Sequence, residues 1–131
     1  MKKLIIFIVA LSLIACRSTK TKLSISKNEL AGTWQWISKT GGFAGKTIQA
    51  SQTGNHIILK ISSTLFEKYE NGKRIFAQPY NVLKDKSIRA TDSIPMLVFK
   101  SGEKQSFEVV NDSLLIYDEC FDCYQNIYIK K

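Results

Sequence analysis

The sequence predicts an all-β fold, an antiparallel up-and-down barrel of eight or nine strands that follow one another in chain order. From Gly32 onward, strand-like runs and turn signals recur at intervals of roughly 8–12 residues, the spacing of sandwiches and barrels. No window of ten or more residues in this part of the chain has a convincing helical periodicity. Consecutive strands joined by short turns close most simply as a barrel.

The first fifteen residues have the composition of an export signal. Met1-Lys2-Lys3 is basic, and Leu4 to Leu11 is almost wholly apolar but too short to span a bilayer as a helix. The following Leu13-Ile14-Ala15-Cys16 resembles the bacterial lipobox, in which the cysteine receives the lipid and becomes the mature amino terminus. The resemblance implies a lipoprotein signal peptide over residues 1–15 and lipidation of Cys16. The alternative is an ordinary signal peptide with an incidental cysteine.

Residues 16–29 are expected to form a lipidated, flexible tether, because Ser, Thr and Lys dominate the segment from Arg17 to Asn28. No acidic cluster follows Cys16, unlike the surface-export signals of some Gram-negative lipoproteins, which favours a protein that faces the periplasm. We expect it in the bacterial cell envelope, anchored by its lipid in the outer membrane. The formal net charge is +8, or roughly +6 without Lys2 and Lys3. The lysines are scattered, so we expect no nucleic-acid partner; attraction to anionic lipid or a solvated basic surface explains them.

The folded domain is expected over residues 30–131. Gly41-Gly42 ends the first strand, Asn71-Gly72 is the strongest hairpin signal, and Asn111-Asp112 marks another turn. Pro79 cannot donate to a strand ladder, so its strand is expected to bend or to lie at an edge there. Two of the expected strands, 47–49 and 87–91, are weak. In chain order the candidate strands, with these two weak ones counted in addition to eight others, are 32–39, 47–49, 56–62, 64–70, 74–82, 87–91, 96–100, 105–110, 113–118 and 125–130.

The first strand carries the most specific motif of the domain. Gly32, Trp34 and Trp36 lie on one face of any strand formed there, and each buried indole removes roughly 150–250 Å² from water. This Gly-x-Trp opening resembles the first strand of the lipocalin-like (calycin) barrels, as in small lipocalin-like lipoproteins of bacteria. The resemblance implies that Trp34 closes one barrel end beneath a basic residue of the last strand, here Lys130 or Lys131. Avidin-like barrels and small barrel inhibitors of metalloproteases share this opening, so it indicates architecture rather than activity.

Aromatic side chains come from most of the expected strands, and they either fill the barrel or line an apolar lumen. The glycine-rich loop at 40–46 is expected beside the opening of such a lumen. A binding module for a small hydrophobic or amphipathic molecule and a filled barrel that contacts another envelope protein are therefore both open. A cavity of about 300 Å³ or more favours the binding module. The candidate ligand-binding residues are Trp36, Phe43, Phe76, Tyr80, Phe107 and Tyr128.

Cys120-x-x-Cys123 is expected to form a local disulfide in an oxidising compartment, because lipidation of Cys16 leaves an even number of cysteines. The neighbouring Glu119 and Asp122 disfavour a reactive thiolate, so redox catalysis is a weaker alternative. A metal site or two free thiols are the others. His56 is the single histidine and has no nucleophile motif beside it. We expect no catalytic site, no metal and no cofactor, and a protein that is not an enzyme.

Overall fold

The computed structural model describes residues 27–131. The predicted signal peptide, the Cys16 lipid site and residues 17–26 of the predicted tether lie outside this part of the chain. The first described element is a single helical turn, α1 (Lys27–Leu30). The last three residues of the predicted tether, 27–29, therefore belong to a helix that packs on the barrel. Within residues 27–131, neither helix is long or apolar enough to cross a membrane.

Nine strands and a second short helix, α2 (Ala50–Thr53), follow α1. The strands are β1 (Gly32–Gly41), β2 (Lys46–Gln49), β3 (Ile57–Ile61), β4 (Leu65–Glu70), β5 (Lys73–Ser87), β6 (Ala90–Phe99), β7 (Lys104–Val110), β8 (Ser113–Asp118) and β9 (Tyr124–Lys130).

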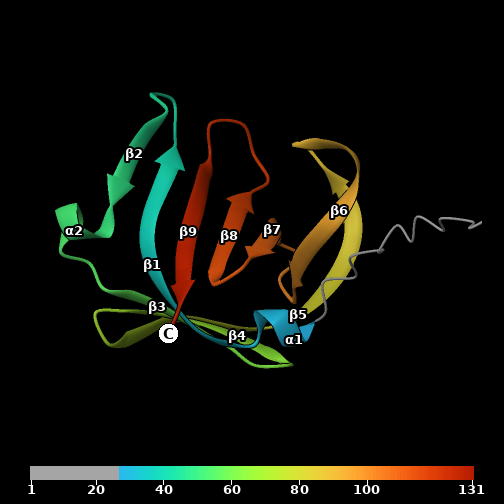
Figure 1. The fold of residues 1–131 in the computed structure, drawn as a ribbon. Coiled ribbons are helices and arrows are strands. Elements are labelled where there is room, and N and C mark those ends of the chain that lie inside the picture. The colour runs from blue at the N-terminus through green and yellow to red at the C-terminus, as the bar shows by residue number, and fades with distance from the viewer. Residues whose placement is uncertain (1–26) are drawn as a thin grey trace, which may run out of the picture.

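The strands form one antiparallel sheet that closes on itself, because β1 pairs with both β3 and β9. Eight strands make the closed barrel, and β2 is an additional strand beside the second half of β1. The predicted all-β, antiparallel up-and-down barrel is thus confirmed. In Figure 1, α1 and the carboxyl terminus lie at the lower end of the barrel, whereas the β1–β2 and β8–β9 connections lie at its upper end.

The lower half of the barrel is filled by side chains. Trp34 and Leu30 are fully buried there, and the Trp34 indole N–H donates a hydrogen bond of 2.8 Å to the Leu30 carbonyl oxygen. Lys27 of the same helical turn donates to the carbonyl oxygen of Tyr80 at 3.1 Å and lies over its ring. Helix α1 therefore seals the lower end and satisfies a buried donor.

Strand β5, the longest, and β6 form a curved two-stranded ribbon at the right of Figure 1. The predicted strand over 87–91 is wrong: Ile88 and Arg89 form the turn of this hairpin. Strand β5 pairs with β4 up to Pro79 and with β6 from Tyr80 onward, so the missing proline donor falls where the strand changes partner. Strand β6 pairs with β7 over three residues only, and Pro95 lies just before them.

The tip of the β5–β6 hairpin folds back onto the outer face of β7 and β8. Met96, Ser106 and Tyr117 form one row across three strands and are buried, yet they do not belong to the barrel core. Arg89 covers this row: its guanidinium lies 3.0 Å from the centre of the Tyr117 ring and donates to the Ser106 hydroxyl at 3.1 Å. Glu119 accepts hydrogen bonds of 3.1 Å from the Ser87 hydroxyl and the Ile88 amide. We call this set of contacts the hairpin clasp.

The β8–β9 turn carries a disulfide between Cys120 and Cys123, whose Cα atoms are 5.5 Å apart. The turn lies against the end of β1, where the Gly42 amide donates to the Cys123 carbonyl oxygen at 3.3 Å. Gly41 has a φ of +138°, and a Cβ at this position would overlap that same carbonyl oxygen. A glycine is therefore required for the disulfide turn and β1 to approach each other.

Candidate ligand-binding lumen

The upper half of the barrel contains a cavity of about 370 Å³. Its walls are side chains of β3 to β9, so it is the lumen of the barrel and not a surface groove between loops. The apolar lining residues are Leu59, Phe66, Ile75, Phe76, Phe99 and Ile116, and the polar ones are Lys68, Glu103, Gln105, Asp118, Asn126 and Tyr128. The volume exceeds the size at which ligand binding is favoured over a filled interior.

Strand alternation explains why these residues face the lumen. On β8, Leu114, Ile116 and Asp118 occupy alternate positions; the first two are buried in the core and the last two line the cavity. Their partners on β9, Tyr128 opposite Leu114 and Asn126 opposite Ile116, point the same way. Leu114, the lowest of these residues on β8, fills the barrel, whereas Ile116, Asp118 and both β9 residues border the cavity.

One wall of the cavity is a rigid aromatic cluster. The rings of Phe66, Phe76 and Phe99 meet edge to face, with centroid separations of 5.2 to 6.1 Å. Tyr80 extends this cluster below the cavity at 6.3 Å from Phe66, and its hydroxyl donates to the Ser62 carbonyl oxygen at 2.7 Å. Such pairs contribute about 0.5–1.5 kcal/mol each beyond their buried area, so this wall is preformed.

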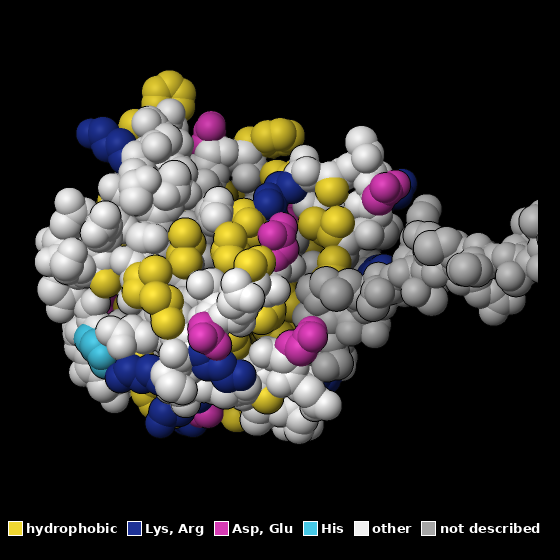
Figure 2. Space-filling model, viewed as in Figure 1, with side chains coloured by type: hydrophobic (Ala, Val, Ile, Leu, Met, Phe, Trp, Pro, Cys, Tyr) yellow, Lys and Arg dark blue, Asp and Glu magenta, His cyan; other side chains and the backbone are white. Residues whose placement is uncertain are grey.

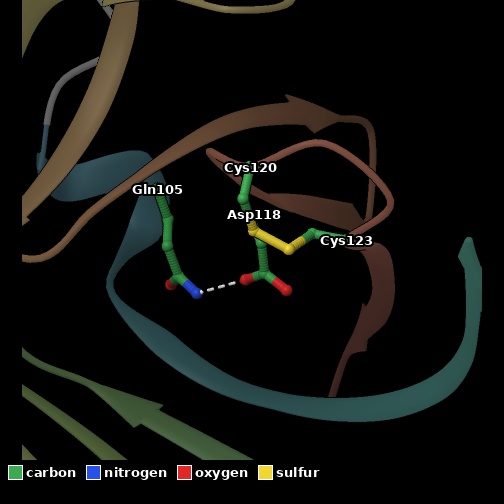
Figure 3. Close-up of a disulfide and its surroundings, with 4 residues drawn as sticks. All are labelled: Gln105, Asp118, Cys120 and Cys123. Carbon is green, nitrogen blue, oxygen red and sulfur yellow. Dashed lines mark hydrogen bonds between the residues drawn. A yellow bond between two sulfur atoms is a disulfide. The ribbon is translucent and has the colours of Figure 1, made fainter. Parts of the chain in front are cut away.

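The opposite wall is polar. Gln105 of β7 and Asp118 of β8 face each other across the ladder, and the Gln105 amide nitrogen donates to an Asp118 carboxylate oxygen at 2.8 Å (Figure 3). The disulfide lies directly beyond this pair, two residues after Asp118 (Figure 3). Tyr128 lies deeper and is 4% exposed. Burial and the negative charge of Asp118 both raise the pKa of Tyr128, so its hydroxyl stays protonated.

The lower end of the barrel brings together the three residues of the predicted closing motif. Trp34 pairs with Lys130 across the β1–β9 ladder, and the Lys130 ammonium lies 5.3 Å from the Trp34 ring centre. Gly32 has a φ of +141°, and a Cβ there would lie 3.1 Å from the Lys130 side chain. The glycine thus leaves the space through which the lysine crosses the indole.

Two of the six predicted ligand-binding residues, Phe76 and Tyr128, line the cavity. Trp36, Tyr80 and Phe107 are buried in the core but do not line it. Phe43 is 97% exposed in the β1–β2 connection, and the glycine-rich loop at 40–46 contributes no lining residue. Most of the lining residues that sequence reasoning missed follow the alternation of the predicted ones, which was the available signal. Ile75, next to Phe76 on β5, and Glu103, just before β7, do not.

One buried polar group and two exposed aromatic side chains complete the description of the barrel. The Trp36 indole N–H is buried without a hydrogen-bond partner. At the surface, Phe43 and Phe121 are 97% and 86% exposed in the β1–β2 and β8–β9 connections. Figure 2 shows hydrophobic side chains projecting from these two connections at the upper end of the molecule. The two aromatic side chains therefore flank the end at which the lumen lies.

Within residues 27–131, no group of three or more His, Cys, Asp or Glu side chains is placed to hold a metal ion.

Comparison of the chain with protein-family models, curated proteins and solved structures yields no match. Function is therefore inferred from the barrel, its lumen and the sequence motifs.

Proposed function

We propose that this protein is a membrane-anchored, lipocalin-like lipoprotein that holds a small hydrophobic or amphipathic molecule in its barrel lumen. The observation that carries the proposal is the cavity of about 370 Å³ above the filled half of the barrel. Small-molecule sites are concave, mostly preformed, and combine an apolar lining with a few polar groups. The Phe66, Phe76 and Phe99 cluster and the facing Gln105–Asp118 pair have this character.

The lipid anchor rests on the Leu13-Ile14-Ala15-Cys16 segment and its resemblance to a lipobox. Each methylene of an acyl chain that enters the bilayer contributes about 0.8 kcal/mol, so a multiply acylated Cys16 holds the protein at the membrane of the cell envelope. Cys16→Ser should release the protein into the soluble fraction. If the variant stays in the membrane fraction and no acylated Cys16 peptide is found, the anchor proposal fails.

Native mass spectrometry of the protein isolated from its own cells tests the lumen directly. We expect a retained small molecule that is lost in Ile75→Trp, because Ile75 lines the cavity and is 48% exposed, so a larger ring can enter the lumen without disturbing the buried core. Leu83→Trp is the matched control: Leu83 lies on the same strand, is 53% exposed and does not line the cavity. Equal ligand occupancy in both variants, or none in the unmodified protein, would contradict lumen binding.

A second candidate function is an interaction module whose loops contact another envelope protein. The almost fully exposed Phe43 and Phe121 support it, because large apolar side chains at adjacent loop tips often mark contact sites. Cross-linking in intact cells, compared between the unmodified protein and a Phe43→Ser, Phe121→Ser double variant, separates the two candidates. A cross-linked partner that disappears in the double variant, with lumen occupancy unchanged, favours the interaction module.

A further inference from the structure

The two walls of the lumen differ in chemistry, and this difference specifies the ligand more closely than its size does; the inference rests on the proposed function. The wall built from β3 to β6 is apolar except for Lys68, which stands between Leu59 and Phe76 in the strand register. The wall built from β7 to β9, with Glu103 just before β7, carries no cation. Its polar lining residues are Glu103, Gln105, Asp118, Asn126 and Tyr128.

The carboxylates of this polar wall form no ion pair within residues 27–131; Lys104, which lines a neighbouring pocket together with Glu103 and Asp118, is paired with Asp85. Among residues 27–131, the ion pairs are Arg74–Glu67 and Lys104–Asp85, so neither Glu103 nor Asp118 is in one. Lys68 lies across the lumen at more than salt-bridge distance from both. The polar wall therefore presents negative charge to whatever occupies the cavity, and a cation placed against it would be held by charge-assisted contacts.

The hydrogen-bonding atoms of the polar wall also favour a positively charged ligand, because several of them are free acceptors. An ionised carboxylate only accepts, so Gln105 contributes its amide nitrogen to Asp118, and its own carbonyl oxygen remains an acceptor. The second Asp118 oxygen is also available. Tyr128, more than nine-tenths buried, borders the cavity, and its protonated hydroxyl can both donate and accept. The free acceptors of the wall are therefore its carboxylate and amide oxygens, and they suit a ligand that carries a donor.

We infer that the lumen takes an amphipathic cation, an aliphatic amine or ammonium compound. Its positive group lies against the polar wall at Asp118, and its hydrocarbon part lies against Phe66, Phe76 and Phe99. The aromatic rings suit the hydrocarbon part of this ligand, because they form a large apolar surface for its methylenes. A carboxylate ligand would have Lys68 as its single cationic partner in the lining and would face two negative charges.

Calorimetric titration of the full-length protein with octylamine, octanol and octanoate tests this inference, because the three probes share a hydrocarbon chain and differ in charge. We expect octylamine to bind about tenfold more tightly than octanol, and octanoate to bind most weakly. Asp118→Asn should remove that tenfold preference and leave octanol binding unchanged, since the asparagine oxygen still accepts from Gln105. Glu108→Gln, which removes the same charge from an exposed position on β7, is the matched control and should change none of the three affinities.

The outcomes separate this inference from the proposed function. Equal affinity for the three probes, or unchanged octylamine affinity in Asp118→Asn, overturns the cationic ligand while leaving lumen binding intact. Tightest binding of octanoate, lost in Lys68→Met, overturns it in favour of an anionic ligand. No binding of any probe to the unmodified protein, whose melting curve reports that it is folded, counts against lumen binding itself.

Discussion

Trp34 determines how the lower end of the barrel is sealed. The indole is fully buried, its N–H is bonded to the Leu30 carbonyl oxygen, and the Lys130 side chain crosses its ring. These contacts join the first strand, the last strand and α1 around one side chain. The Trp34 side chain thus fills the floor of the barrel while its own buried N–H group is satisfied. The cavity above depends on this floor.

Trp34→Ala should lower the free energy of unfolding by about 3–5 kcal/mol, because it leaves a large cavity in a close-packed floor. Phe43→Ala removes an aromatic side chain that is 97% exposed and should change stability by no more than about 0.5 kcal/mol. Urea unfolding of both variants measures the difference. Similar stabilities for the two would mean that Trp34 does not seal the barrel.

At the scale of elements, the β5–β6 hairpin depends on contacts far away in the sequence. In the outer half of the hairpin, β5 and β6 pair only with each other. The tip is held by hydrogen bonds to Glu119 and by Arg89, which lies over the Tyr117 ring. Burial opposes the charge on Glu119, but hydrogen bonds from Ser106, Ser87 and Ile88 and the charge of Arg89 outweigh it and lower the pKa of Glu119. The hairpin clasp is therefore strongest when Glu119 is ionised.

The clasp should make stability depend on pH in the acidic range. Because the pKa of Glu119 is lower in the folded state, its contribution is fully present above the unfolded value of about 4.3 and is lost as the pH falls below it. In Glu119→Gln, the free energy of unfolding should therefore fall less steeply with acidification between about pH 6 and pH 3. Glu108→Gln is the control, and identical slopes in both variants would contradict the clasp.

The disulfide turn is the second element that links distant parts of the barrel. It connects β8 to β9 and meets the end of β1 at Gly41 and Gly42. The oxidised protein should show no free thiol at Cys120 or Cys123, and replacing both with Ser should lower stability by about 2 kcal/mol, since so short a loop restricts few unfolded conformations. Lumen binding should be unchanged. Free thiols at both positions, or thiol–disulfide exchange activity that the double variant loses, would contradict a structural role.

For the molecule as a whole, the barrel was predictable because local signals repeat along most of the chain. Asn71-Gly72 and Asn111 have positive φ values in their turns, as the turn chemistry requires. The segment between Val82 and Pro95 was not predictable as paired strand. Its residues are mostly exposed and polar, without the alternation of a half-buried strand, and distant residues such as Glu119 hold it in place.

The sequence was sufficient to predict that a lumen could be present, but not which residues line it. Alternation identifies which side chains of a strand face inward, and on that basis Phe107 and Tyr128 are equivalent. Their height in the barrel differs, however: Phe107 is packed in the core and Tyr128 borders the cavity. Height depends on strand register across the closed sheet, including the shift between Trp36 and Ser38 on β1, which no local pattern specifies. Apart from Tyr128, the polar wall was missed, because its other members are not aromatic.

Methyl NMR during titration with octylamine can show whether the cavity in the upper half of the barrel is the binding site. Leu59, Ile75 and Ile116 line the cavity and provide methyl probes from three strands. Ile88, Val110 and Ile129 provide exposed reference methyls outside it. We predict saturable shifts at the cavity methyls and none at the exposed ones. Shifts confined to the exposed methyls, or no saturable shift at Leu59, Ile75 and Ile116, would contradict a ligand-binding lumen.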